Sequence, residues 1–231
     1  MDVFPEVGLC APELTVREEA GVSLPQLVWR LGPGQRVCSS AVLGGGLGER
    51  GWVLNAQVPP GYCRTDPAAH LAELARTAGL EGAGAGLMTA AQVARFTEAE
   101  EAGVRTVVTT GLGVRGWAAE RPPGLPGPPA AGTVNTVLVV AVPLSDAALV
   151  NAVATATEAK VQALLDAGAD CSGTPSDAVC VVAPVPAAGG TAEPFAGPRS
   201  RWGARIARTV YAATLDGARD WRLNSARAQE I

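Results

Sequence analysis

The sequence predicts an α+β fold: a single domain, residues 1–231, in which helices pack on a mixed, largely antiparallel sheet. Three strand-like segments follow one another before any helix, which indicates hairpins rather than a repeating βαβ pattern. A strand, a helix and a second strand then succeed one another over residues 133–184. Hydrophobic residues make up 48% of the chain and charged residues 17%, a composition that supports a substantial core. A layered arrangement with two sheets between helices fits the same pattern.

The three N-terminal strands are predicted at residues 26–31, 37–43 and 51–58, each bounded by glycine or proline. The glycine-rich run at 44–48 is expected to be a loop, because glycine permits backbone conformations that other residues avoid. A helix should follow Asp66, a suitable N-cap residue, with Pro67 at its first position, and should end at Gly79.

The middle of the chain contains two further predicted β segments, at residues 86–98 and 104–112. The second is rich in β-branched residues, whereas residues 88–96 within the first also fit a helix. Two stretches rich in proline and glycine, 118–132 and 185–198, are expected to be surface loops, the first of them a lid or a spacer.

The C-terminal part holds the clearest unit: a strand at 133–142, a helix at 145–167 and a strand at 177–184. The first strand is apolar on both faces near its end, which is typical of a central strand. Ser145 should cap the helix at its N-terminus. A final helix is predicted at 201–216, where apolar residues recur at helical spacing.

Charge and composition exclude several classes of function. The formal net charge is −4, from 22 acidic and 18 basic residues, so there is no basic field to attract nucleic acid or an anionic membrane surface. The acidic N-terminus lacks the features of a signal peptide. The longest strongly apolar run, 137–142, is too short to cross a bilayer. These features predict a cytoplasmic protein without membrane insertion, and they leave oligomer formation open.

The five cysteines include no Cys-x-x-Cys pair, and the chain has one histidine, so no structural metal site is expected. We therefore predict free thiols in a reducing compartment rather than a framework of disulfides.

Two side chains stand out because each residue type occurs once: Lys160 is the single lysine and His70 the single histidine. A helical wheel places Lys160 at the edge of an apolar arc that includes Val150 and Leu165, with Thr155 on the opposite face. The Lys160 amine could snorkel into water, or could pair with a carboxylate or a substrate oxygen. His70 lies in the first turn of its helix, where the dipole favours the neutral ring. It could act as a general base or be a half-buried structural histidine.

The first polar loop of interest follows the second predicted strand. Ser39 and Ser40 precede the glycine run that contains Gly44 and Gly45. Backbone N–H groups in such a loop can bind a carboxylate, an amide oxygen or an oxyanion, although glycine-rich turns after strands are also common without a ligand.

The second polar stretch precedes the strand at 177–184. Thr174 and Ser176 lie close to Asp177, an arrangement that can bind a polar ligand, supply a nucleophile or form an ordinary turn. Two other carboxylates lie on the helix at 145–167. Asp146 is in its first turn, where the dipole stabilises a carboxylate, and Glu158 is at an edge of the apolar arc.

Together, these motifs resemble those of one family. In order, they are residues 39–46 followed by Asn55, Asp66-Pro67 with His70-Leu71, 86–91, 132–135, 143–152 running on to Lys160, Gly173-Thr174 with Asp177, 195–198 and Tyr211. Their order and spacing are similar to those of the adenosylcobinamide amidohydrolases over about residues 25–221. The sequence departs from the family pattern at two positions. Ser176 stands where threonine is expected, and Pro175 lacks the N–H that an oxyanion contact at this amide would use.

The resemblance implies hydrolysis of the amide that joins the aminopropanol arm to the corrin ring of adenosylcobinamide. The product would be adenosylcobyric acid, which re-enters cobamide synthesis by salvage. A cobalt corrinoid is then the substrate, and no further cofactor or metal is expected. Two other functions remain as alternatives: a non-catalytic corrinoid-binding protein, and an amidase for a different amide.

Two mechanisms are compatible with these residues. In one, a carboxylate activates water while Lys160 and loop amides hold the oxyanion. In the other, a hydroxyl attacks the amide with His70 or Lys160 as its base. The candidate catalytic residues are Asp146, Glu158, Lys160, Asp177, His70 and Thr174. The candidate substrate-binding residues are Ser39, Ser40, Gly44, Gly45, Asn55, Asn135, Asn151 and Ser176.

Overall fold

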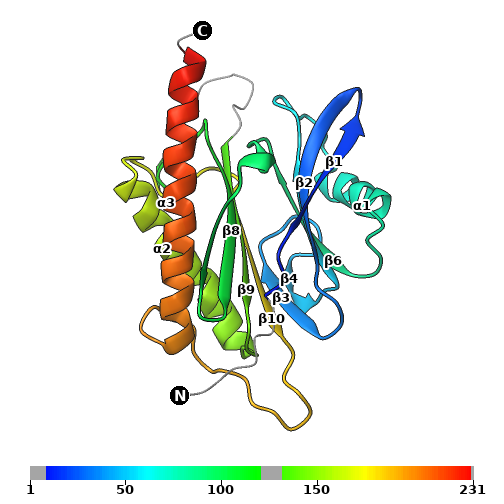
Figure 1. The fold of residues 1–231 in the computed structure, drawn as a ribbon, viewed down its shortest axis with the longest axis vertical. Coiled ribbons are helices and arrows are strands. Elements are labelled where there is room, and N and C mark those ends of the chain that lie inside the picture. The colour runs from blue at the N-terminus through cyan, green and yellow to red at the C-terminus, as the bar shows by residue number, and fades with distance from the viewer. Residues whose placement is uncertain (1–8, 121–131, 230–231) are drawn as a thin grey trace.

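The computed structural model describes residues 9–120 and 132–229 of the chain. Its elements form four layers: one helix, two sheets packed face to face, and a pair of helices (Figure 1). The predicted α+β class is confirmed, in its layered form with two sheets between helices.

The N-terminal sheet has four strands in the order β1-β2-β5-β6. In that order they span Glu13–Glu19, Val22–Arg30, Trp52–Gln57 and Gly84–Thr89. The pairs are antiparallel except for β5–β6. The crossover between those two parallel strands is α1 (Pro67–Thr77), which covers the outer face of this sheet by packing Leu71 and Leu74 around Trp52.

The central sheet has six strands in the order β4-β3-β10-β9-β8-β7. In that order they span Gly46–Glu49, Gln35–Ser39, Ala178–Pro184, Gly132–Val140, Val104–Leu112 and Thr97–Glu101. β9 and β10 are parallel, and the other pairs are antiparallel. All of β9 is buried, as predicted for a central strand. Apolar side chains such as Leu87 from the N-terminal sheet and Val137 from the central sheet fill the space between the two sheets.

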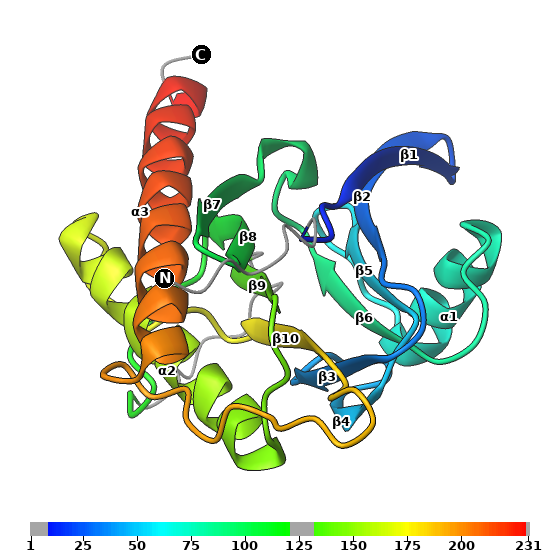
Figure 2. The same cartoon turned by 60° about the horizontal axis from the view of Figure 1, so that its bottom comes forward.

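Two helices, α2 (Asp146–Asp166) and α3 (Arg201–Gln229), cover the other face of the central sheet (Figure 2). α2 is the crossover between the parallel strands β9 and β10. Ser145 caps it as predicted, because its Oγ accepts a hydrogen bond of 3.1 Å from the Ala148 N–H.

The buried face of α2 differs from the one that the helical wheel predicts. Most of its buried side chains are alanines, whereas Val150 and Leu165 are 61% and 44% exposed. Thr155, predicted on the solvent face, is buried and donates its hydroxyl to Ala196 O at 2.8 Å. Alanine side chains are small and let the helix approach the sheet and α3 closely. Close packing therefore determines which face is buried, and the larger apolar side chains remain on the exposed face.

Several predicted boundaries need correction. β1 is missing from the predicted strands, although it pairs with β2 through a tight turn at Ala20 and Gly21, both with positive φ. It is an edge strand with charged residues along it, so its apolar signal is weak. The end of the predicted glycine loop at 44–48 belongs to β4, which pairs with β3. The final helix continues from the predicted end at residue 216 to Gln229.

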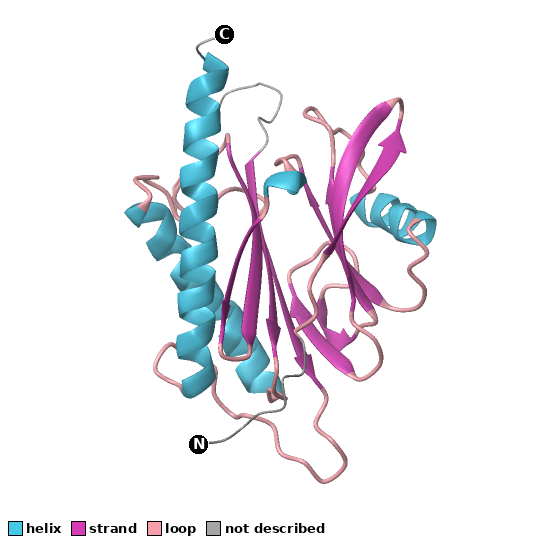
Figure 3. Ribbon diagram, in the orientation of Figure 1, coloured by secondary structure: helices cyan, strands magenta, loops and turns pink. Residues whose placement is uncertain are grey.

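The predicted strand at 86–98 is three elements: the end of β6, the short 3-10 helix η1 (Val93–Arg95) and the start of β7. η1 lies between the two sheets (Figure 3), where the Val93 N–H donates to Gln57 Oε1 at 2.9 Å. The predicted loop at 185–198 contains no helix or strand. Most of the predicted loop at 118–132 lies outside the described residues.

Candidate active site

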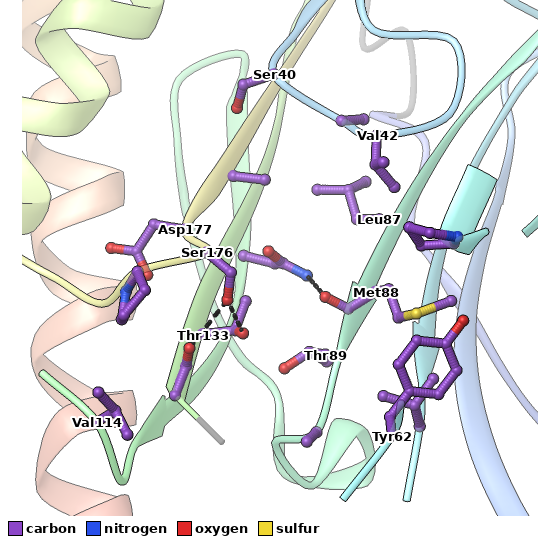
Figure 4. Close-up of a pocket in the computed structure, with 18 of the residues that line it drawn as sticks. Ser40, Val42, Tyr62, Leu87, Met88, Thr89, Val114, Thr133, Ser176 and Asp177 are labelled. Carbon is purple, nitrogen blue, oxygen red and sulfur yellow. Dashed lines mark hydrogen bonds between the residues drawn. The ribbon is translucent and has the colours of Figure 1, made fainter. Parts of the chain in front are cut away.

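A cavity of about 610 Å³ opens where the end of β6 meets the starts of β9 and β10. The loop after β5 and the residues after β3 complete its wall. On the central-sheet side it is lined by Thr133, Asn135, Ser176 and Asp177, and on the other side by apolar residues that include Met88. Figure 4 shows Ser176 and Thr133 pointing toward the middle of the cavity, and Asp177 pointing away from it. The cavity therefore joins a polar floor to an apolar wall.

Asp177 is the hub of the polar floor. Its Oδ1 accepts hydrogen bonds from the Val134 N–H at 2.8 Å and from Thr174 Oγ1 at 2.5 Å. Its Oδ2 accepts from Lys160 Nζ at 2.5 Å and from the Thr174 N–H at 3.2 Å. Four hydrogen-bond donors thus fix this carboxylate. Only one of them, the Thr174 hydroxyl, is an oxygen that could act as a nucleophile after giving its proton to Asp177.

Lys160 extends from the alanine-rich face of α2 to this carboxylate. Its side chain is 9% exposed and that of Asp177 is 13% exposed. Of the two roles considered from the sequence, the structure shows the amine paired with a carboxylate and not snorkelling into water. Two opposite charges held 2.5 Å apart away from water depend on each other, because either one alone would carry a large desolvation cost.

Gly173 makes room for the ion pair. A Cβ atom at this position would lie 2.3 Å from Asp177 Oδ2 and 2.6 Å from Lys160 Nζ, and the residue has a φ of +154°. Only glycine combines this backbone conformation with space for the two charged groups.

Gly173→Ala is therefore expected to displace the pair, lowering the free energy of unfolding by about 1–3 kcal/mol and lowering kcat as well. Urea denaturation and an activity assay measure the two effects. Gly51→Ala is the matched control, since a Cβ there would meet only Ala83 O, at an ordinary 3.8 Å. Unchanged stability and activity in Gly173→Ala would show that the pair does not need this geometry.

Two hydroxyls converge beside the hub on the carbonyl oxygen of Gly132, and a third is bonded to one of them. Thr174 Oγ1 lies 2.8 Å and Ser176 Oγ 3.0 Å from this oxygen, and Thr133 Oγ1 lies 2.7 Å from Ser176 Oγ (Figure 4). Among the described serines and threonines, only Thr174 also makes a hydrogen bond to a carboxylate. Thr174 is thus the hydroxyl that has a base within reach; it adjoins the lining residues Pro175 and Asp177 and is not itself among them.

Asn135 and Asn55 form a buried amide network next to the hydroxyls. Asn135 Nδ2 donates to Asn55 Oδ1 at 2.9 Å and to Met88 O at 3.1 Å, and Asn55 Nδ2 donates to Thr109 Oγ1 at 3.0 Å. Because the Met88 carbonyl can only accept, it fixes which end of the Asn135 amide is the nitrogen. The Asn135 Oδ1 atom is buried with no partner among the described residues. Of these two predicted binding residues, Asn135 lines the cavity and Asn55 supports it from behind.

The predicted serine and glycine loop contributes less than expected. Ser40 lines the cavity, and its Oγ accepts from the Val179 N–H at 3.1 Å. Ser39 is buried behind it and donates to Val179 O at 3.0 Å. Gly44 and Gly45 are not among the cavity-lining residues. Their carbonyls accept from the Arg50 guanidinium, at 2.9 Å and 3.5 Å.

His70 does not reach the hydroxyls. It is buried, and its Nδ1 lies 3.0 Å from Tyr62 Oη while its Nε2 lies 3.1 Å from Glu19 Oε1. In this structure its ring contacts the cavity wall through Tyr62, so the predicted role as base for a serine or threonine has no geometric support.

The other predicted residues on α2 lie outside the cavity. Asp146 forms an ion pair with Arg36 at the start of the helix, and its side chain is 63% exposed. Glu158 is exposed and borders a different hollow, between α2 and α3. Asn151 is exposed next to Gly197. The structure thus brings together Lys160 and Asp177 but not the other carboxylates predicted from the sequence.

Three cavity residues are absent from the predicted site. Thr133 is part of a motif quoted for the family resemblance, but its hydroxyl was not singled out. Thr89 lines the cavity and its Oγ1 accepts from the Ala91 N–H at 3.0 Å. Tyr62 lines the opposite wall. Thr133 lies near the start of β9, Thr89 ends β6 and Tyr62 lies in the loop after β5. These residues come together because the two sheets pack against each other.

The five cysteines are free thiols, as predicted. Burial raises the pKa of Cys171 and raises that of Cys180, the cysteine nearest Asp177 in sequence, to about 12. Neither cysteine is among the residues that line the cavity, whereas the hydroxyl residues Thr133 and Ser176 are. Within residues 9–120 and 132–229, no group of three or more histidine, cysteine, aspartate or glutamate side chains could hold a metal ion. No helix in the same ranges is long and apolar enough to cross a membrane.

Comparison with known proteins identifies a family that matches most of this chain. Residues 11–226 match the family described as adenosylcobinamide amidohydrolase. A protein of Methanosarcina mazei named adenosylcobinamide amidohydrolase is 33% identical over 177 residues, which cover 74% of this chain and 84% of that protein. The matched region includes both sheets and the whole cavity.

Proposed function

This chain belongs to the adenosylcobinamide amidohydrolase family, and from that membership we propose that the cavity hydrolyses the amide joining the aminopropanol arm of adenosylcobinamide to the corrin ring. The observation that carries the assignment to this cavity is the polar floor, where the lining residue Asp177 is bonded to Thr174 and Lys160 behind it. The products are adenosylcobyric acid, which serves cobamide salvage, and 1-amino-2-propanol. The free thiols are consistent with a cytoplasmic enzyme.

The size of the cavity indicates how the substrate lies. About 610 Å³ suits a drug-sized ligand, and a corrinoid is considerably larger. We therefore place the amide-bearing arm and one edge of the ring inside the cavity, and the rest of the corrinoid outside. The polar floor then faces the amide, while the apolar wall faces the ring edge.

We assign Thr174 as the nucleophile and Asp177 as its base. The Thr174 hydroxyl gives its proton to Asp177 Oδ1 as the oxygen attacks the amide carbon. Asp177 then gives that proton to the departing amine as the carbon–nitrogen bond breaks. Water hydrolyses the resulting ester, which releases the carboxylic acid and restores the hydroxyl.

Lys160 holds Asp177 in place before the attack, and its positive charge balances the negative charge of this largely buried carboxylate. Ser176 and Thr133 face the cavity, and their hydroxyls, which are bonded to Gly132 O and to each other, can turn toward the oxyanion. These hydroxyls replace the backbone N–H that Pro175 lacks. The groups that react with the amide are side chains of this protein and a water molecule. The cobalt is part of the substrate.

The direct test is to incubate the protein with adenosylcobinamide and to measure free 1-amino-2-propanol and adenosylcobyric acid by mass spectrometry. We expect equal amounts of the two products. Corrinoid binding without release of the amine would instead identify a non-catalytic binding protein. Hydrolysis of other amides but not of adenosylcobinamide would identify an amidase of different specificity.

A further inference from the structure

A chain of hydrogen bonds runs behind the apolar wall of the cavity and includes the single histidine. Tyr62, in the loop between β5 and α1, borders the cavity next to Met88 (Figure 4). Its phenol oxygen lies 3.0 Å from His70 Nδ1, and the two rings are stacked with centroids 5.6 Å apart. His70 itself is 3% exposed and lies on α1.

The partners of His70 determine where its protons lie. Nε2 faces Glu19 Oε1 at 3.1 Å, and a carboxylate can only accept, so Nε2 carries hydrogen. In the neutral ring Nδ1 is then an acceptor and the Tyr62 hydroxyl donates to it. Burial raises the pKa of Tyr62, which keeps the phenol protonated for this bond. The Tyr62 hydroxyl is thus engaged in a hydrogen bond to His70. The aromatic ring is the part of Tyr62 that can contact a ligand.

The chain is anchored at its other end in the N-terminal sheet. Arg17 Nη2 donates to Glu19 Oε2 at 2.8 Å and to Gln57 O at 2.6 Å. Gln57 is the last residue of β5, immediately before the loop that carries Tyr62. The start of this loop is therefore held at Gln57, and its middle is held at Tyr62 through His70 and Glu19.

We propose that His70 is a positioning residue that holds Tyr62 as a fixed aromatic wall for the flat, largely apolar ring of the substrate. The inference rests on the proposed function, since it names the part of the substrate that this wall binds. Val42, Leu87 and Met88 beside Tyr62 offer apolar contacts in the same wall. The proposed nucleophile Thr174 lies in the turn before β10, on the other side of the cavity, so His70 acts on ring binding and not on the chemical step.

Two substitutions of His70 separate its two contacts. Glutamine can reach the position of Nε2 and keep Glu19, but leaves Tyr62 without an acceptor. Asparagine can occupy the position of Nδ1 and keep Tyr62, but loses Glu19. Tyr62→Phe removes the same bond from the other side while retaining the ring. Arg76→Gln, at an exposed position of α1, is the control.

The measurements are equilibrium dialysis of adenosylcobyric acid and steady-state hydrolysis of adenosylcobinamide. Loss of the Tyr62–His70 bond should raise the Kd and KM about fivefold in His70→Gln and in Tyr62→Phe, with kcat within about twofold of wild type. His70→Asn should retain a Kd close to that of wild type. The double variant Tyr62→Phe/His70→Gln should show the same fivefold increase as each single variant, because both changes remove one bond.

A Kd in His70→Gln within the error of wild type, a multiplied effect in the double variant, or a loss of kcat instead of binding would overturn the proposal. The assay of the wild-type protein tests the proposed reaction independently of the aromatic wall. Binding of the corrinoid without hydrolysis would count against the proposed reaction and still allow the wall to be tested. Wild-type hydrolysis with unchanged binding in the variants would count against the wall alone.

Discussion

Thr174→Val should lower kcat by a factor of about 1,000 or more, with a much smaller change in KM. Valine keeps the shape of threonine and removes the hydroxyl, which lies 2.5 Å from Asp177 Oδ1. The chemical step would lose its nucleophile, while the cavity keeps its form. Initial rates of 1-amino-2-propanol release over a range of adenosylcobinamide concentrations measure both constants.

Two variants control for this change. Thr157→Val makes the same substitution at an exposed position of α2 and should leave kcat unchanged. Ser176→Ala removes a cavity-facing hydroxyl that has no carboxylate beside it, and we expect a decrease of about tenfold from a lost contact to the oxyanion. If Ser176→Ala abolished turnover and Thr174→Val did not, the attacking hydroxyl would be Ser176.

Lys160→Met should destabilise the protein by about 3–5 kcal/mol and abolish most of its activity. Methionine fills the space of the lysine stem but leaves the buried Asp177 carboxylate without its counter-charge. An uncompensated buried carboxylate would not keep the position in which it accepts the Thr174 proton. Urea denaturation measures the stability, and the amine-release assay measures the activity.

The double variant Lys160→Met/Asp177→Asn distinguishes the charge effect from packing. With both charges removed, much of the stability should return, but the activity should not, because the base is also gone. Arg208→Met is the surface comparison: it breaks the exposed pair with Glu101, which should matter far less than the buried pair. Equal losses of stability in Lys160→Met and Arg208→Met would contradict the account of the buried pair.

The sequence predicts the elements of this fold well where local signals agree. β8 and the α2 crossover have nearly the predicted bounds, since β-branched runs and a serine cap specify them locally. β1 escapes prediction because charged residues dominate an edge strand, and its partner β2 lies across a tight turn. The face of α2 is also mispredicted, because close packing of alanines against the sheet is a property of the tertiary structure.

The candidate site was also predicted in part by local sequence signals and in part only by the tertiary structure. Rarity and local clustering pointed to Lys160, Asp177 and Thr174, but α2 and the turn before β10 had to meet in space to make them one unit. The same reasoning included Asp146 and Glu158, which lie on the same helix as Lys160 but point elsewhere. Sequence spacing places residues on an element, whereas the packing of that element decides which of them reach the cavity. His70 is similar: its rarity marked it, and its contacts define a role in the cavity wall.

The most direct test of the catalytic account is intact-protein mass spectrometry of enzyme quenched in acid during turnover of adenosylcobinamide. The account predicts a transient increase equal to the mass of the corrin acyl group, bound through an ester that peptide mapping locates at Thr174 and that is absent from Thr174→Val. An adduct on another residue, or a burst of 1-amino-2-propanol with no adduct on the protein, would contradict it.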